Sequence, residues 1–169
     1  MTPFADYQQL LEDLDKVLSA ISGASEGSLC PTGCSSCCEA FTLLPVEASV
    51  IASRSRPGDF AAAGDGRCPL LTAQGRCSAY AFRPLLCRVR GFPIFSLDSD
   101  GKPSCEACGK SRPERACEAA RALHLDEWNA RLYAVNARFC EENGISPRRL
   151  DVQDLYRWSM TAANAAART

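Results

Sequence analysis

The chain of 169 residues has little histidine and little net charge. It contains one histidine, and its 19 Lys and Arg residues against 20 Asp and Glu residues leave a net charge of −1. A nearly neutral protein lacks the positive field that attracts polyanions. We therefore expect neither a nucleic acid nor an anionic membrane surface as its partner.

Long apolar runs and familiar catalytic motifs are also missing. No stretch of about 18 or more uncharged apolar residues occurs, so a transmembrane helix is not expected. Residues 1–7 carry no positive charge ahead of an apolar segment, unlike a secretory signal, and we expect a cytoplasmic location. HExxH and phosphate-binding glycine loops are absent. The sequence therefore names no general acid or base and leaves open whether the protein is an enzyme.

Cysteine is the residue in excess. The chain has eleven cysteines, an odd number that cannot all form pairs. In a reducing compartment such a density indicates metal binding or catalysis more often than disulfides. Single buried cysteines are the ordinary alternative, because a thiol packs well in a core. Most of these cysteines are clustered, however, and clustering favours metal binding.

The first cluster reads Cys30-Pro-Thr-Gly-Cys34-Ser-Ser-Cys37-Cys38. Thiolates two or three residues apart converge when the backbone between them turns tightly, and Gly33 permits such a turn. Convergence of sulfur ligands is what tetrahedral zinc or an iron–sulfur cluster requires. Cys37 and Cys38 are neighbours, so their side chains diverge and can hardly face the same centre. We expect one of them to serve a second centre or to pack in the core.

The middle of the chain adds Cys68, Cys77 and Cys87 in a basic setting. Between Arg67 and Leu97 there are five arginines and no Asp or Glu. Four thiolates around a divalent ion or a cubane cluster carry a net charge of about −2, which arginines and backbone amides can offset. The alternatives are that these arginines form a solvated face or bind a phosphate elsewhere.

Further motifs follow the first cluster: Cys68-Pro-Leu-Leu, Gly75-Arg-Cys77-Ser-Ala-Tyr80, Arg83-Pro-Leu-Leu-Cys87-Arg88 and Arg115-Ala-Cys117. Together these spaced motifs, over about residues 29–120, resemble the YkgJ family of cysteine-cluster proteins, which is described as chelating zinc or iron. A related cysteine motif occurs in flagellin lysine methylases, which are associated with an iron–sulfur cluster. The resemblance implies eight metal-associated cysteines, and these are Cys30, Cys34, Cys37, Cys38, Cys68, Cys77, Cys87 and Cys117.

Two features depart from the family pattern. The first spacing has three residues where other members have two, and Cys105-x2-Cys108 is an addition. That pair fits a zinc half-site, a redox pair or a local extra. Cys140 falls on an apolar helical face and is expected in the core. His124 falls in a predicted helical stretch and is expected to be solvated or capping rather than a metal ligand.

Eight thiolates divide naturally into two sites of four, and the vicinal pair would then send one sulfur to each site. The many cysteines and their acid-free surroundings favour one or two iron–sulfur clusters, of the 4Fe–4S type, although thiolate-only sites also suit zinc. The expected function is a redox role, or support of an enzyme that modifies a protein or peptide partner. The alternative is a zinc-binding structural or metal-handling protein without catalysis. Radical-SAM enzymes share the first spacing, but this chain has too few βα units for their barrel.

The expected fold is mainly α, with an N-terminal helix and a C-terminal helical hairpin around an irregular, cysteine-rich centre with a little β structure. We expect one domain, in which the N-terminal helix lies within residues 1–26, the cysteine-cluster core within 27–120 and the C-terminal helices within 121–169.

Local signals predict the individual elements. Apolar residues recur at helical spacing from Phe4 to Ile21, and Gly23 is expected to end that helix. A short helix is predicted within 45–55, a strand within 91–97 and a turn over 98–101. Three later helices are predicted, over 113–123, over 126–143 with Asp126 as the cap, and from Ser146-Pro147 onward with Leu150, Leu155 and Trp158 inward.

Overall fold

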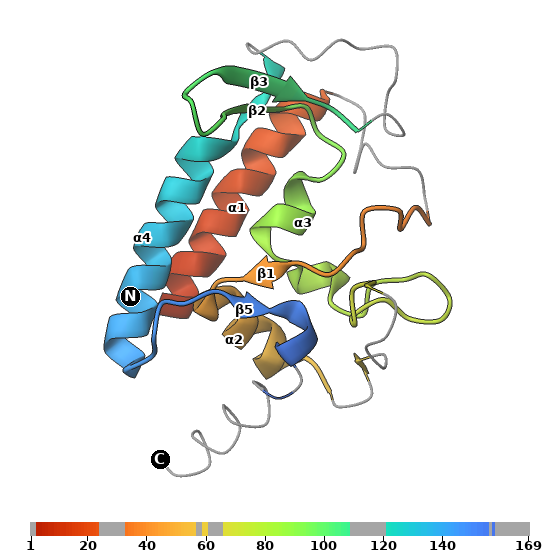
Figure 1. The fold of residues 1–169 in the computed structure, drawn as a ribbon, viewed down its shortest axis with the longest axis vertical. Helices are drawn as coiled ribbons and strands as arrows, with labels where there is room; N and C mark the ends of the chain where they lie inside the picture. The colour runs from red at the N-terminus through yellow and green to blue at the C-terminus, as the bar shows by residue number, and fades with distance from the viewer. Residues whose placement is uncertain are drawn as a thin grey trace. The chain divides into compact units, whose positions relative to one another are not determined.

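The computed structural model describes residues 3–23, 33–56, 59–60, 66–108, 121–155 and 157. Within these ranges no helix combines the length and apolar character needed to cross a bilayer. The elements, shown in Figure 1, are in chain order α1 (Pro3–Ser22), β1 (Thr42–Leu43), α2 (Pro45–Arg54), the 3-10 helix η2 (Tyr80–Phe82), α3 (Leu85–Val89), β2 (Ile94–Leu97), β3 (Pro103–Glu106), β4 (Leu123–His124), α4 (Leu125–Asn143), β5 (Leu150–Asp151) and the 3-10 helix η4 (Val152–Asp154).

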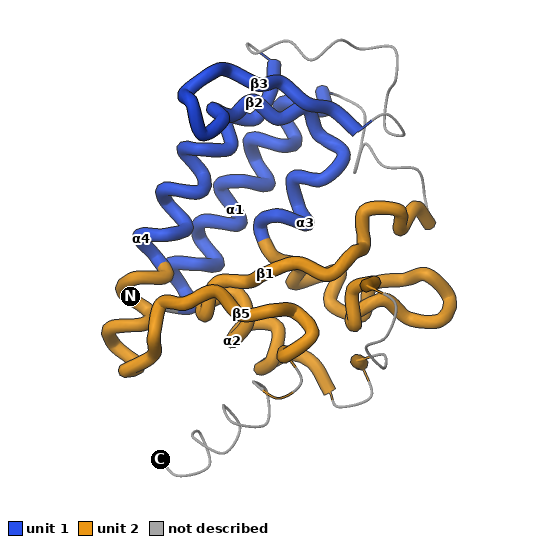
Figure 2. The backbone as a smooth tube through the Cα atoms, in the orientation of Figure 1, with its two compact units in different colours: residues 1–32, 85–135 blue, residues 33–84, 136–169 orange. Residues whose placement is uncertain are grey.

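The chain forms two compact units, and each unit combines segments that are distant in sequence. Unit 1 comprises residues 1–32 and 85–135, and unit 2 comprises residues 33–84 and 136–169 (Figure 2). Helix α4 therefore contributes its first part to unit 1 and its last part to unit 2. The single domain predicted from the sequence, with its three parts bounded at residues 26 and 120, stays a prediction.

The amphipathic N-terminal helix predicted from the sequence is confirmed as α1. Its buried apolar residues are Tyr7, Leu10, Leu11, Leu14 and Leu18. The helix ends at Ser22, because Gly23 adopts φ 68°, a left-handed conformation that glycine accepts without strain. Phe4 and Val17, which also follow the apolar spacing, remain 44% and 38% exposed.

Ion pairs connect α1 to the other helices of unit 1. Arg131, on the first part of α4, has its Nη2 atom 2.9 Å from Asp13 Oδ2 of α1. Arg88, in α3, has its Nη1 atom 2.5 Å from Asp15 Oδ2 of α1. The Arg131 guanidinium also stacks 4.5 Å from the centre of the Trp128 ring. Because Arg131 donates to it, the pKa of the Asp13 carboxyl is held below its usual value.

A three-stranded sheet with the order β3-β2-β4 completes unit 1. Strands β2 and β3 form a hairpin around the predicted turn, and Asp98 shapes this turn because Asp98 Oδ1 accepts the N–H groups of Asp100 and Lys102. Strand β4 pairs in parallel with β2, with Leu123 opposite Ile94. This strand has no counterpart in the sequence prediction.

Two expectations around β4 are wrong. The helix predicted over 113–123 does not reach Leu123, which is in a strand, and residues 113–120 lie outside the described part of the chain. Helix α4 begins at Leu125, so Asp126 is not its cap. Asp126 Oδ2 instead accepts the N–H of Leu97 at 2.8 Å, which ties α4 to the end of β2.

In unit 2, helix α2 starts at Pro45 as predicted, and two buried side chains satisfy the backbone at its start. Glu47 accepts the N–H of Leu44 at 3.1 Å, and Asn136 Oδ1 accepts the N–H of Val46 at 3.1 Å. These N–H groups have no carbonyl partner within the helix, so the side chains replace the missing acceptors. The first turn of α2 is thereby fixed to the last part of α4.

The helix predicted from Ser146-Pro147 is wrong at its start. Helix α4 ends at Asn143, before Gly144 with φ 62°, and Leu150–Asp151 then form β5. Strand β5 pairs antiparallel with β1, which places Leu150 opposite Leu43. Pairing with a distant strand here overrides the local signal of Pro147. The expected C-terminal hairpin of helices is therefore replaced by β5 and η4 up to Asp154, and Trp158 lies outside the described residues.

The mainly α prediction is confirmed, with small β pairings between the helices.

The core of unit 2 is small and draws on most of its segments. The core residues are Leu43, Ala48, Ile51, Cys68, Leu70, Ala79, Val152 and Leu155.

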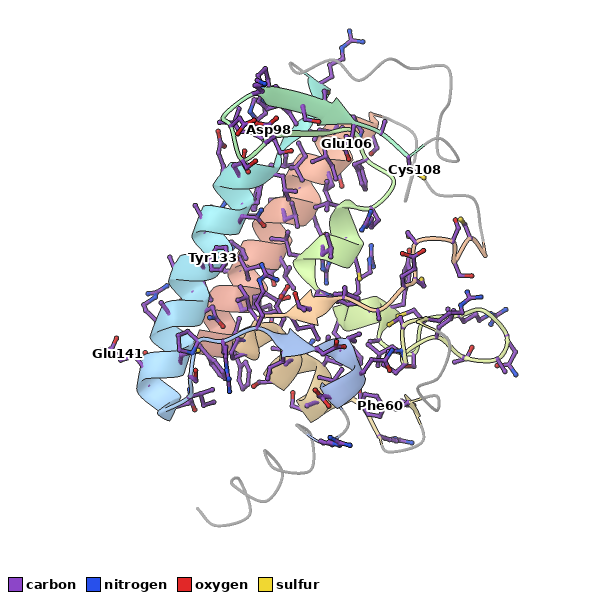
Figure 3. All side chains as sticks on the ribbon, viewed as in Figure 1. Phe60, Asp98, Glu106, Cys108, Tyr133 and Glu141 are labelled. Atoms are coloured by element: carbon purple, nitrogen blue, oxygen red, sulfur yellow. The ribbon has the colours of Figure 1, made fainter. Side chains whose placement is uncertain are left out.

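Asn136 offers a test of the buried contact between α4 and α2. Replacing it in Asn136→Leu leaves the Val46 N–H without its acceptor while keeping the side-chain volume similar. We expect the free energy of unfolding, measured by urea denaturation, to fall by about 1–3 kcal/mol. Glu141→Gln, on the exposed face of α4 (Figure 3), is the control and should change it by less than about 0.5 kcal/mol. Equal stability of the two variants would show that the hydrogen bond is unimportant.

Candidate metal centre

The cysteines predicted to bind metal fall into three groups. Cys87 lies in α3 of unit 1. Cys30 and Cys117 lie outside the described residues, so the structure does not place them. Five predicted ligands lie in unit 2, and these are Cys34, Cys37, Cys38, Cys68 and Cys77.

Backbone pairing brings Cys38 directly opposite Cys68. The Cys68 N–H donates to the Cys38 carbonyl at 3.1 Å, and the next residues, Glu39 and Arg67, form an antiparallel bridge. Residues opposite each other in such a ladder have neighbouring side chains on the same face. Two cysteines 30 positions apart in the sequence thus form one cross-strand pair.

A second pairing brings Cys77 back toward Cys68. Leu71 and Cys77 form an antiparallel bridge, and the Ser78 N–H donates to the Leu70 carbonyl at 2.8 Å. Gly75, with φ 72°, supplies the left-handed residue of the turn between the two paired segments. The segment from Cys68 to Cys77 is therefore a tight hairpin.

These three cysteines share one apolar environment. Cys68 is 8% exposed and belongs to the core of unit 2, while Cys38 and Cys77 are half-buried and pack against that same core. Three thiols from separate motifs therefore meet one group of apolar side chains. We call Cys38, Cys68 and Cys77 the thiol cluster.

The loop that carries Cys34 and Cys37 lies beside both paired segments. Ser35 Oγ accepts a hydrogen bond from Arg67 Nη2 at 3.3 Å, and a Cβ placed on Gly75 would lie 3.9 Å from it. The Ser35 carbonyl also accepts the N–H of Cys38 at 3.0 Å. Ser35 therefore connects the loop to the residue before Cys68 and to the turn before Cys77.

The vicinal cysteines have different surroundings. Cys37 is exposed, whereas Cys38 is half-buried against the core. Burial raises the pKa of the Cys38 thiol to about 11, and the sulfurs of Cys37, Cys68 and Cys77 add to the effect. The charge of Arg67 acts in the opposite direction.

Backbone amides partly offset the effect of burial on the other two thiols. Burial raises the pKa of Cys68 and of Cys77, but each sulfur accepts a hydrogen bond from the N–H two residues later. The donors are Leu70 and Ala79. Amides placed in this way stabilise a thiolate and tune a bound metal. The sequence analysis missed these donors, because a backbone N–H carries no residue-type signal.

The donor set fits zinc or iron, since clustered thiols with N–H donors are the ligands that both metals take in thiolate sites. In the part of the chain that the structure describes, however, no group of three or more His, Cys, Asp or Glu side chains is close enough to hold a metal. Thiols that bind a metal do so as thiolates, so binding would release their protons.

The remaining candidates lie elsewhere. His124 belongs to β4 of unit 1 rather than to a helix, and its ring lies 4.9 Å from that of Phe95. Cys140 is 4% exposed and hydrogen-bonded to Asn136, which confirms the prediction that it is a core residue.

The additional cysteine pair lies at β3 in unit 1. Cys105 pairs with Phe95 across the hairpin, and Cys108 follows just beyond the end of β3 (Figure 3). Cys105 is disulfide-bonded, so a zinc half-site formed by Cys105 and Cys108 requires that this bond is first reduced.

Together these features define a mainly helical protein in which backbone pairing gathers thiols at the edge of a small core. The profile of the family described as "CxxCxxCC: Putative zinc- or iron-chelating domain" matches residues 29–141. The chain belongs to this family, which confirms the resemblance stated from the cysteine motifs. No significant match was found among curated proteins or among solved structures.

Thiol reactivity tests the environment of the thiol cluster. In metal-free protein at about pH 8, iodoacetamide should modify Cys38 more than about ten times more slowly than Cys37, because a raised pKa leaves less reactive thiolate. The rate at Cys38 should increase as the pH approaches 11, the pKa of its thiol. Peptide mapping by mass spectrometry gives the rate at each position. Similar rates at both cysteines would contradict the buried placement of Cys38.

Proposed function

We propose that the protein binds a metal centre in unit 2 through the thiol cluster and a fourth thiolate from the loop of Cys34 and Cys37. The observation that carries this proposal is the shared position of three predicted ligands on one core. The loop supplies the fourth sulfur in the proposal because Ser35 holds it against the segments of the other three. Cys30, Cys87 and Cys117 stay predicted metal ligands outside this set of four.

An iron–sulfur cluster of the 4Fe–4S type is the cofactor that we propose. Its support is the all-thiolate donor set, the paired N–H donors and a sequence setting with arginines and no acids. Zinc is the second candidate, because the family description names both metals. A bound cluster would supply one-electron chemistry or an open iron, whereas zinc would supply a structural cross-link.

The chain's own residues have distinct roles in this proposal. Core residues such as Leu70 and Ile51 exclude water from one side of the thiol cluster. The N–H groups of Leu70 and Ala79 orient two sulfurs and stabilise their thiolate forms. The exposed Cys37 lies on the solvent side, where a protein or peptide partner could reach the centre. We propose a cytoplasmic redox function or the support of an enzyme that modifies such a partner.

Metal analysis of matched cysteine variants tests the site. Anaerobically purified wild-type protein should be brown and contain iron and inorganic sulfide, while colourless protein with stoichiometric zinc would favour the second candidate. Cys68→Ser should lose at least about half of the metal, since about four sulfurs are needed for each centre. Cys140→Ser is the control, because Cys140 is equally buried but outside the thiol cluster. Full metal content in Cys68→Ser would exclude Cys68 as a ligand.

Removal of the metal tests its contribution to stability. The binding energy of a structural metal is comparable to the whole net stability of a domain. We expect treatment with a strong chelator to lower the Tm by more than about 10 °C while helical circular dichroism persists. Cys140→Ser should show the same decrease and Cys68→Ser a smaller one. An unchanged Tm in wild-type protein shown to lose its metal would contradict a stabilising centre.

A further inference from the structure

The segment that carries Cys68 and Cys77 has an unusual charge. Residues 66–84 contain Arg67, Arg76 and Arg83 and no Asp or Glu. A centre with four thiolates and a zinc ion, or an oxidised cubane cluster, carries a net charge of about −2. Such a charge at the edge of an apolar core is unfavourable unless positive groups are placed near it. The local sequence therefore contains enough positive charge to neutralise the centre.

Arg83 is held in place immediately after the segment of Cys77. The helix η2 follows Cys77, with the Tyr80 N–H donating to the Cys77 carbonyl at 3.3 Å. Arg83 Nη1 donates to the Tyr80 carbonyl at 3.0 Å, and its guanidinium carbon lies 4.2 Å from the centre of the Tyr80 ring. A long side chain with two such contacts keeps its charge in one position. Tyr80 itself is 55% exposed, so its ring serves this contact more than the core.

Arg67 is fixed next to Cys68. It precedes Cys68, and its backbone is held both by the bridge to Glu39 and by Gln153 Nε2, which donates to its carbonyl at 3.0 Å. Its side chain reaches Ser35 in the loop of Cys34 and Cys37. The charge of Arg67 is thereby held at Ser35, in the loop that carries Cys34 and Cys37.

The two arginines lie next to different cysteines. Arg67 directly precedes Cys68, whereas Arg83 is held at the helix that follows Cys77. The exposed Arg76 lies in the turn of the same hairpin, where its N–H donates to Thr72 Oγ1 and its carbonyl accepts the Thr72 N–H. Arg76 therefore provides a matched reference.

On the basis of the metal-binding function proposed above, we infer that Arg67 and Arg83 are built-in counter-charges for the four-thiolate centre, each offsetting one of its two net negative charges, and that Tyr80 is the positioning residue that fixes Arg83. The consequence is that the centre is close to neutral as a whole. A neutral assembly binds a divalent metal or a cluster more tightly, and an iron–sulfur cluster in it is easier to reduce.

The test measures metal affinity in variants that keep or remove each charge. Metal-free protein is titrated with Zn²⁺ alone against a chromophoric chelator, at low and at high salt. We expect Arg83→Gln to weaken Zn²⁺ binding by about tenfold at low salt and by less at high salt, because screening reduces the lost attraction. Arg83→Lys should retain affinity within about threefold, since it keeps the charge. Arg76→Gln, the control, should bind like the wild type.

Arg67 and Tyr80 complete the set of variants. The double variant Arg67→Gln/Arg83→Gln should lose about a hundredfold in affinity if the two charges act independently. Tyr80→Leu should lose part of what Arg83→Gln loses, while Tyr80→Phe, which keeps the ring, should not. The Tm of metal-free Arg83→Gln should equal that of metal-free Arg76→Gln, because without metal there is no four-thiolate centre for Arg83 to stabilise.

The outcomes separate this inference from the function on which it rests. Wild-type protein that binds neither Zn²⁺ nor an iron–sulfur cluster would overturn both. Wild-type protein that binds metal while Arg83→Gln and Arg76→Gln bind it equally well would overturn the counter-charges alone. A loss of affinity that Arg83→Lys does not restore, together with a lowered Tm of the metal-free protein, would assign Arg83 a structural role instead.

Discussion

The antiparallel pairing of the Cys38 and Cys68 segments is the interaction on which the rest of unit 2 depends. It sets Cys38 opposite Cys68 and Glu39 opposite Arg67. Because side chains alternate between the two faces of paired strands, this register turns both thiols toward the core and leaves Glu39 and Arg67 exposed. A shift by one residue would reverse the two faces and move the thiols into solvent. The position of the sulfurs is thus a property of backbone pairing.

Local signals in the sequence predicted the elements whose cause is local. The periodicity of α1 with Gly23 after it, Pro45 at the start of α2 and the turn at Asp98 each depend on residues close together in the chain. Strands β4 and β5 were missed, because each is two residues long and exists only through its distant partner. For the same reason the motif spacing indicated which cysteines are candidate metal ligands, but not that Cys38 and Cys77 meet at one core. The backbone N–H groups that donate to sulfur could not be predicted, because the residue type does not indicate them.

The core that gathers the thiols also opposes their ionisation. Burial alone raises the pKa of all three, and their mutual proximity adds to this at Cys38. The protonated thiols are therefore compatible with an apolar environment when no metal is present. In the proposed centre, a metal would replace these protons and bring negative charge to the same place, where the N–H groups of Leu70 and Ala79 donate to two of the sulfurs. The same set of residues would thus serve a neutral state and a charged one, which a purely apolar core could not do.

Cys87 depends on a different kind of support. Helix α3 has five residues, too few to be stable alone, and Arg88 ties it to α1 through an ion pair with Asp15 in which the Arg88 side chain is only 10% exposed. Small metal-dependent domains such as zinc fingers lack an independent core and unfold without their metal. Here the residues that place Cys87 and the thiol cluster belong to helices and apolar cores made mostly of residues other than the predicted ligands. A bound centre would therefore add to the stability that this packing provides.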